Sequence, residues 1–263
     1  MSSNSASDTR GQATSLEPQR QACTSGVLSV VATPIGNLGD MTPRAVDVLC
    51  AVDFAYSEDT RVSRRLFNHF KIDTPLRRFD DKTSERKIPE ILELLVQGKD
   101  VALVSDAGTP VISDPGMPLV DAALDADLEV VTIPGPSAAV AALSISGLPA
   151  HAYYFGGFLP RKAGKRENLL QSLHELNATL IFFESPYRVT TVLQHLAKLY
   201  PDRQAAVARE LTKKYEELVR GNLKELADEF TARKEAADAG KGATIKGEFV
   251  ILIAPTNWKR SQQ

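Results

Sequence analysis

The first half of the chain alternates short apolar runs with helix-like patterns of apolar residues. Strand-like runs occupy 27–32, 54–56, 101–104 and 128–133, and helical patterns between and after them cover 43–50, 60–70, 88–95 and 118–126. Strands that alternate with helices at this spacing pair in parallel, because each helix carries the chain back to the edge where the previous strand began. The sequence therefore predicts an α/β fold with a mostly parallel sheet over 27–136.

The second half has a different pattern. Strand-like runs at 153–158, 180–184, 205–209, 217–220 and 248–254 interleave with helical patterns at 138–145, 166–176, 187–199 and 223–237. The runs at 205–209 and 217–220 lie close together, which favours a hairpin and thus an antiparallel or mixed sheet. We expect a second, mixed-sheet α/β domain over 137–256, joined to the first through Ile133-Pro134-Gly135-Pro136-Ser137.

The two ends of the chain carry no periodic apolar pattern. Residues 1–26 are rich in Ser, Thr, Gln and Ala and are predicted to be a disordered leader, and 257–263 a short tail. The whole chain is 43% hydrophobic and 24% charged, as in ordinary globular proteins. No apolar run is long enough to cross a bilayer, and the N-terminus lacks the apolar centre of a signal peptide. We expect a cytoplasmic protein with no membrane partner.

Several kinds of site are excluded by the sequence. The two cysteines and four histidines lie far apart, so we expect neither a disulfide framework nor a metal site. No glycine-rich dinucleotide fingerprint, phosphate-binding P-loop or nucleophile elbow is present.

Three loops that follow strands remain as candidates, at 33–40, 105–116 and 134–138. All are built from Gly, Pro, Ser, Thr and Asp, and the loop at 105–116 is the densest in turn-forming residues. Ligands of open α/β sheets bind just beyond the carboxyl ends of strands. We therefore expect these loops to bind a ligand largely through backbone groups.

Six motifs in order resemble one known family. They are Thr33-Pro34-Ile35-Gly36-Asn37-Leu38-Gly39-Asp40, Ser57-Glu58-Asp59-Thr60-Arg61, Ser105 to Gly116, Ile133-Pro134-Gly135-Pro136-Ser137, Gly157-Phe158-Leu159-Pro160-Arg161-Lys162, and Phe183-Glu184-Ser185-Pro186-Tyr187-Arg188. Over Val27 to Ala254 the chain resembles the tetrapyrrole methylase-like (class III) S-adenosylmethionine-dependent methyltransferases. The second and fifth motifs are similar to the RNA-modifying branch, and Ser105-Asp106-Ala107 departs from the Gly-Asp-Pro of corrinoid enzymes.

The resemblance implies two α/β domains with a cleft between them for S-adenosylmethionine. The cofactor-binding positions that it implies are Pro34, Asp106, Ala107, Gly108, Thr109, Ser137, Ala138, Phe183, Glu184 and Ala208, with Gly247 and Glu248 as further candidates. An acid such as Asp106 suits the ammonium, sulfonium or ribose hydroxyls of this cofactor, and hydroxyls such as that of Thr109 suit its carboxylate. The alternative for Asp106 is an Asx-turn that only shapes the loop.

The implied reaction is methylation of the ribose 2′-oxygen of a cytidine in small-subunit ribosomal RNA, either free or in the assembled subunit. A ribose hydroxyl is a weak nucleophile at neutral pH, so a group that accepts its proton would help. Candidates are Glu58, Asp59 and Glu210, with Lys213, Lys214 or Arg61 at a phosphate. The alternative for Glu58 and Asp59 is that they only cap the helix that follows.

Local clusters of basic residues fit an RNA partner, although the net charge is −2. The candidate RNA-binding residues are Arg61, Arg64, Arg161, Lys162, Lys165 and Arg166, the last four being on a loop after the aromatic run at 153–158. Arginines 61, 64 and 65 could equally form a solvated helix face. The family resemblance also implies a homodimer.

Two other functions stay open at this point. One keeps the fold and the cofactor but has a tetrapyrrole or another small molecule as the methyl acceptor, which the basic residues at 161–166 disfavour. The other is a non-catalytic RNA-binding factor of ribosome assembly with a relict cofactor site, which the three intact loops disfavour.

Overall fold

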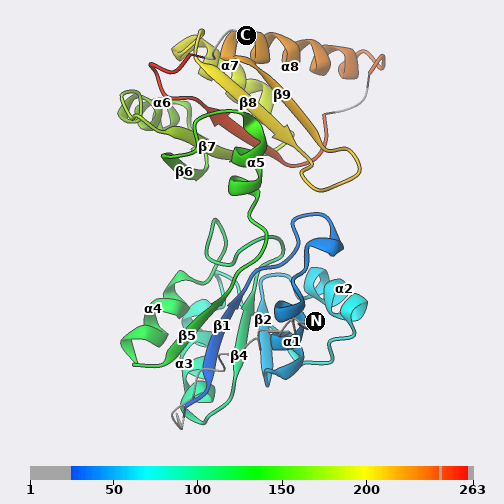
Figure 1. Ribbon diagram of the computed structural model, residues 1–263, viewed down its shortest axis with the longest axis vertical. Coiled ribbons are helices and arrows are strands. Elements are labelled where there is room, and N and C mark those ends of the chain that lie inside the picture. Colours follow the sequence, from blue (N-terminus) through cyan, green and yellow to red (C-terminus); the bar gives the residue numbers. More distant parts are fainter. Residues whose placement is uncertain (1–24, 243–244, 260–263) are drawn as a thin grey trace, which may run out of the picture.

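The computed structural model describes residues 25–242 and 245–259, and it contains two five-stranded sheets. Nearly all of the predicted leader and part of the predicted tail lie outside these residues. In Figure 1 the strands β1 to β5 lie in the lower body and β6 to β10 in the upper one, and a single green segment joins the two between β5 and α5. Within the described ranges, no helix is long and apolar enough to span a membrane.

The first sheet is entirely parallel, which confirms the predicted topology. Its strand order is β3-β2-β4-β1-β5. The strands are β1 (Val27–Val31), β2 (Phe54–Ser57), β3 (Leu76–Arg78), β4 (Val101–Val104) and β5 (Glu129–Ile133). The carboxyl ends of all five strands therefore meet at one edge, the edge that is adjacent to the second body in Figure 1.

Helices cover both faces of this sheet. They are α1 (Pro43–Ala51), α2 (Thr60–Phe70), α3 (Ser84–Val96) and α4 (Met117–Asp125), with a short 3₁₀ helix η1 (Leu38–Asp40). Val104 packs with α1 and α2, and its neighbour Leu103 packs with α3 and α4. All four residues of β4 are buried, so its apolar run is continuous instead of alternating.

The second sheet is mixed, with the order β6-β7-β10-β8-β9. Its strands are β6 (Tyr153–Phe158), β7 (Thr179–Glu184), β8 (Gln204–Arg209), β9 (Glu217–Asn222) and β10 (Phe249–Ile253). Strands β8 and β9 pair antiparallel, so the predicted hairpin is confirmed. Only the β6–β7 pair is parallel.

Four helices accompany the second sheet: α5 (Ala138–Ser146), α6 (Ala163–Ser172), α7 (Val189–Leu199) and α8 (Leu223–Asp238). One core cluster contains residues of α6, α7 and α8, and a separate cluster contains residues of α5. Alternating residues of β10 belong to the two clusters, Ile251 to the first and Leu252 to the second. Helix α5 thus packs on the opposite face of the sheet from the other three.

Two features differ from the expectations. Strand β3 was missed because it has three residues, two of them arginines, and none is fully buried. The basic segment at 161–166 is not an open loop, because α6 begins at Ala163.

Candidate functional site

Hydrogen bonds join the three predicted ligand loops beyond the carboxyl ends of β1, β4 and β5. Thr33 and Gly108 exchange two backbone bonds, with N···O distances of 2.8 and 3.0 Å. The hydroxyl of Thr109 donates to the carbonyl of Pro136 at 3.3 Å. The three loops therefore form one connected backbone surface.

The 105–116 loop holds unusual backbone conformations. Val111 and Ser113 have φ angles of 76° and 66°, a region that residues with a Cβ rarely adopt and β-branched residues especially avoid. The Ser105 hydroxyl, which is buried, donates to the Gly108 carbonyl at 2.9 Å. Surrounding contacts thus hold a loop that would not take this shape in isolation.

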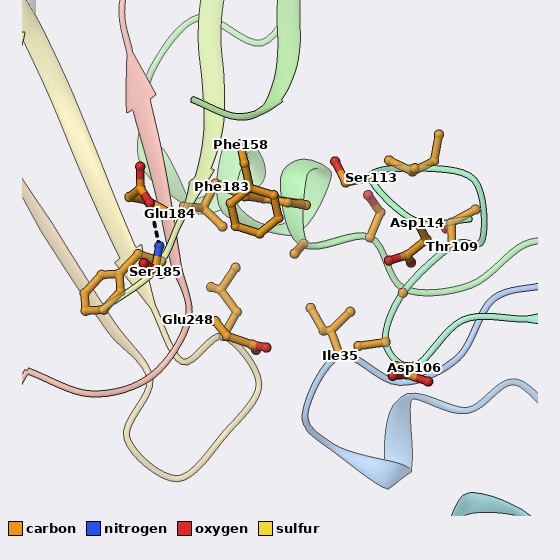
Figure 2. A pocket seen from close by; sticks show the side chains of 18 of the residues that line it. Ile35, Asp106, Thr109, Ser113, Asp114, Phe158, Phe183, Glu184, Ser185 and Glu248 are labelled. Atoms are coloured by element: carbon orange, nitrogen blue, oxygen red, sulfur yellow. Dashed lines mark hydrogen bonds between the residues drawn. The ribbon is translucent and has the colours of Figure 1, made fainter. Parts of the chain in front are cut away.

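A pocket of about 390 Å³ lies between the two bodies, with this loop as one wall. Figure 2 shows Ile35, Asp106 and Asp114 on the side of the first body, and Phe183 and Glu248 on the side of the second. The remaining lining residues are Glu58, Ala107, Gly108, Thr109, Ile112, Ser113, Ser137, Ala138, Phe158, Glu184, Ser185, Pro186, Leu211, Phe249 and Val250. Both sheets are needed to enclose this volume.

Three carboxyl groups make the wall from the first body acidic. Burial raises the pKa of Glu58, Asp106 and Asp114, and for Asp114 it raises the pKa to about 6, with further contributions from the charges of the other two. One Asp106 oxygen accepts the backbone N–H of Asp59 at 3.1 Å. A cation in this pocket would be attracted to the wall and would favour the ionised carboxylates. Among the described residues, no group of three or more His, Cys, Asp or Glu side chains is placed to hold a metal ion.

A fourth carboxyl group lies on the opposite wall. The side chain of Glu184 is fully buried, and its Oε1 accepts the backbone N–H of Ser185 at 2.8 Å, the dashed line in Figure 2. Its Oε2 is 3.2 Å from Arg188 Nη2 but accepts no well-aligned hydrogen bond from any described residue. Burial raises the pKa of this carboxyl as well. Since the side chain has no exposed area, this carboxyl is compensated by Arg188 and is not presented to a ligand in the pocket.

Most of the expected cofactor-binding residues line this pocket. Those that do are Asp106, Ala107, Gly108, Thr109, Ser137, Ala138, Phe183 and Glu184, and of the further candidates Glu248. Pro34 and Ala208 do not line it. Ala208 is fully buried in β8, where it pairs with Val250, so the strand next to it presents a residue to the pocket instead.

Sequence reasoning missed about half of the lining. Asp114 could have been found, because it stands in the same turn cluster as Asp106 and is equally an acid. No sequence pattern indicated that Leu211 and Val250 line the pocket, since their side chains reach it only through the order and register of the second sheet.

The structure places the four candidate catalytic residues in four different environments. Glu58 lines the pocket. Asp59 is the N-cap of α2, and hydrogen bonds from Arg61 hold the pKa of its carboxyl well below its usual range. Glu210 accepts from Lys213 Nζ at 2.9 Å and from the backbone N–H of Glu248 at 3.1 Å, outside the pocket lining. Lys214 is exposed, with its Nζ 5.5 Å from the centroid of the Tyr215 ring.

The candidate RNA-binding residues are exposed with one exception. Arg61 and Arg64 lie exposed on α2, and Arg161, Lys162 and Lys165 lie exposed at the start of α6. Arg166 is buried, and its guanidinium donates to His195 Nδ1 at 2.9 Å and to the Pro160 carbonyl at 3.3 Å. It connects α6 to α7 and cannot present its charge to RNA, so its assignment as an RNA contact is corrected.

Known proteins resemble this chain in sequence and in fold. The family model described as tetrapyrrole (corrin/porphyrin) methylases matches residues 27–227. A Micromonospora olivasterospora protein named ribosomal RNA small subunit methyltransferase I is 47% identical over 88% of this chain and 71% of its own length. A Mesorhizobium japonicum protein of the same name is 46% identical over 89% and 77%.

A solved structure has the same fold. It is uroporphyrin-III C-methyltransferase from Thermus thermophilus in complex with S-adenosyl homocysteine, with a TM-score of 0.56 and 20% identity over 86% of this chain and 96% of that one.

Proposed function

Because the chain belongs to the tetrapyrrole methylase family, we propose that it transfers a methyl group from S-adenosylmethionine to the ribose 2′-hydroxyl of a cytidine in small-subunit ribosomal RNA. The observation that carries the choice of RNA is the 47% identity to a protein named as a ribosomal RNA methyltransferase. Likeness to the tetrapyrrole enzyme is limited to 20% identity, so it supports the fold and not the acceptor.

The residues of the pocket fit S-adenosylmethionine, which supplies an activated methyl group when bound. The acidic wall of Glu58, Asp106 and Asp114 suits a ligand with an ammonium and a sulfonium. The hydroxyl of Ser137 and the backbone amides of Thr109 and Ser137 suit its carboxylate. The half-exposed ring of Phe158 offers an apolar surface for a planar base.

In this proposal the protein mainly orients the acceptor and accepts its proton. The hydrogen-bonded loops hold the methyl donor in one place, and in-line alignment supplies a large share of the rate. When bound, the donor would supply its activated methyl group to the acceptor oxygen, and the carboxylate of Glu58 would accept the hydroxyl proton. Arg61, Arg64, Arg161, Lys162, Lys165 and Lys214 would contact phosphates.

The test is to incubate the protein with methyl-labelled cofactor and with small ribosomal subunits, naked small-subunit RNA or a tetrapyrrole precursor. We expect label on a cytidine ribose in RNA. Label on the tetrapyrrole alone would overturn the choice of acceptor. RNA binding without any binding of cofactor would instead favour the non-catalytic assembly factor.

A pair of isosteric variants distinguishes the roles of the two adjacent acids, Glu58 and Asp59. Glu58→Gln is expected to lower kcat by about 10²-fold or more, because a general base contributes on the order of 10²–10⁴-fold. Asp59→Asn is the comparison variant: Asn still caps α2 but loosens Arg61, so KM for RNA should rise while kcat stays within a few-fold. Single-turnover methylation assays measure both. An equal loss in the two variants would remove the special role of Glu58.

We also propose that the protein works as a homodimer in the cytoplasm. Two apolar side chains of α5, Val140 and Ile145, are 51% and 43% exposed beside the segment that joins the bodies, and a second copy would cover them. Light scattering coupled to size exclusion measures the mass, and a monomer at micromolar concentration would contradict the dimer.

A further inference from the structure

A second pocket adjoins the first at the same edge of the parallel sheet. It encloses about 500 Å³ and is lined by Glu58, Asp59, Thr60, Arg61, Arg78 and Asp106. We call it the arginine pocket. Glu58 and Asp106 line both pockets, so they form the boundary between them.

The arginine pocket lies at the carboxyl edge of the first sheet because of how β2 and β3 pair. Ser57 of β2 pairs in register with Arg78 of β3, so the residues that follow β2 and the last residue of β3 come together at the carboxyl edge. The first pocket takes most of its first-body wall from the loops beyond β1, β4 and β5. One continuous edge therefore carries two adjacent cavities, the usual place for ligands in parallel sheets.

Both arginines are held in position while keeping donors free. Arg61 Nε donates to Asp59 at 3.0 Å, and Arg78 Nε donates to Asp80 at 2.7 Å. The Nη2 of Arg61 also contacts Asp59, and the Nη2 of Arg78 also contacts Asp80. Within the described residues, neither Nη1 has a hydrogen-bond partner. An arginine that is oriented on one edge loses less freedom when its other N–H groups bind an oxyanion.

Methyl transfer requires the acceptor to bind directly beside the cofactor, at the boundary between the two pockets. In-line transfer places the attacking oxygen in contact with the methyl carbon, so the acceptor site must open directly into the donor site. Of the two pockets, the arginine pocket alone is lined by cations, which are suited to the phosphates on either side of a ribose.

We infer that the arginine pocket binds the acceptor nucleotide of RNA, with Arg61 and Arg78 on its phosphates and Glu58 at its ribose. This inference rests on the proposed function and adds Arg78, which is not among the candidate RNA-binding residues predicted from the sequence. Its occupant is a phosphate-bearing single-stranded nucleotide, because an unpaired base can leave the helix and enter a pocket.

The test measures binding of a fluorescent fragment of small-subunit RNA to the full chain, saturated with S-adenosyl homocysteine, over a range of salt concentrations. Arg78→Gln is expected to weaken binding about tenfold, as the loss of one charged hydrogen bond does. The slope of log Kd against log salt should fall by about 0.7, the value for one phosphate contact on a single strand.

Arg86→Gln is the matched control, because Arg86 is exposed on α3 and lines neither pocket. It should leave the affinity and the slope unchanged. Arg61→Gln is a second test variant in case Arg78→Gln does not fold, and the melting temperature and the affinity for S-adenosyl homocysteine verify each protein.

Each outcome of these binding measurements either supports or contradicts the assignment of the arginine pocket. A loss at Arg78 without loss at Arg86 supports the arginine pocket, and Arg61→Gln replaces Arg78→Gln in this comparison only if the latter does not fold. If Arg78→Gln behaves as Arg86→Gln does while the wild-type protein methylates RNA, the pocket assignment is wrong and the proposed function survives. A wild-type protein that binds the cofactor product but neither the RNA fragment nor small ribosomal subunits overturns both.

Discussion

Neighbouring residues of the same type take different roles at this site. Glu58 and Asp59 are adjacent acids, yet Asp59 is occupied by capping α2 and by Arg61, whereas Glu58 stays at the boundary of two pockets. The local charges differ accordingly: hydrogen bonds lower the pKa of Asp59, and burial raises that of Glu58. The environment of each side chain therefore separates a structural acid from a chemically available one.

Asp106 is the residue on which we expect cofactor affinity to depend most. Asp106→Asn keeps the size of the side chain but removes one charge from the acidic wall, so the affinity for S-adenosylmethionine should fall about tenfold or more. Titration calorimetry measures it. Asp121→Asn, on the exposed face of α4, is the control that should bind normally. Unchanged affinity in Asp106→Asn would reduce Asp106 to a residue that shapes the loop.

Asp114 is expected to make stability depend on pH. Its pKa is raised from 3.8 to about 6, mainly by burial, so between these values the folded state holds a proton that the unfolded state has lost. Its contribution to stability is complete below pH 3.8 and is lost as the pH rises through 6. The free energy of unfolding of the wild type should therefore fall, relative to Asp114→Asn, between pH 4 and pH 7 on urea titration. Parallel curves for the two proteins would contradict this.

Among the elements, the 105–116 loop between β4 and α4 contributes most to the pocket. It supplies the acids Asp106 and Asp114 and the exposed Ile112, and it bonds to both neighbouring loops. Its positive φ angles at Val111 and Ser113 place strain beside the bound ligand, as is common at functional sites. The rigid core of β4 beneath it, buried in every residue, opposes relaxation.

Gly116, where this loop ends, should not tolerate a side chain. Its φ is 137°, and a Cβ there would lie 2.7 Å from Leu103 Cδ2 in the core. Gly116→Ala is expected to cost about 1–3 kcal/mol of unfolding free energy, because both the backbone and the packing oppose it. Gly164→Ala, with nothing within 4 Å, is the control that should be neutral or slightly stabilising. Equal stability of the two variants in urea would show that the loop adapts freely.

On the scale of the whole molecule, the main pocket is shared between two bodies that each have their own sheet and core. Ile35 and Asp106 face Phe183 and Glu248 across it (Figure 2). Lys213 of the second body also approaches the first, since a Cβ on Gly36 would clash with its Cγ. A ligand in the pocket therefore contacts both bodies and stabilises their relative arrangement.

Binding of S-adenosyl homocysteine should accordingly stabilise the molecule as a whole. At a concentration of one hundred times Kd, linkage predicts a gain of about 2.7 kcal/mol. Hydrogen exchange should slow both in 105–116 and in 183–186, on opposite walls. Adenosine at the same concentration is a control without the amino-acid portion. Protection restricted to one body would contradict a shared site.

The chain's own pattern was enough for four of the five strands of the first sheet and for about half of the pocket lining. Strand β4 is a continuous apolar run and β1 and β2 are largely so, because burial on both faces leaves no polar alternation, whereas the edge strand β5 exposes Glu129 and Thr132. The loops after β1, β4 and β5 are all turn-forming sequence, and the loop after β4 carries Asp106 and Thr109. Local composition thus determined where the ligand loops lie, since backbone turns depend on the residues within them.

Tertiary structure alone decided which distant residues complete the site. Arg78 reaches the edge beside Glu58 through the register of β2 and β3, and Leu211 and Val250 enter the pocket through the order of the second sheet. Arg166, basic in a basic segment, is turned inward by its bond to His195. Such placements depend on contacts between residues far apart in the chain, and a local sequence pattern does not specify those contacts.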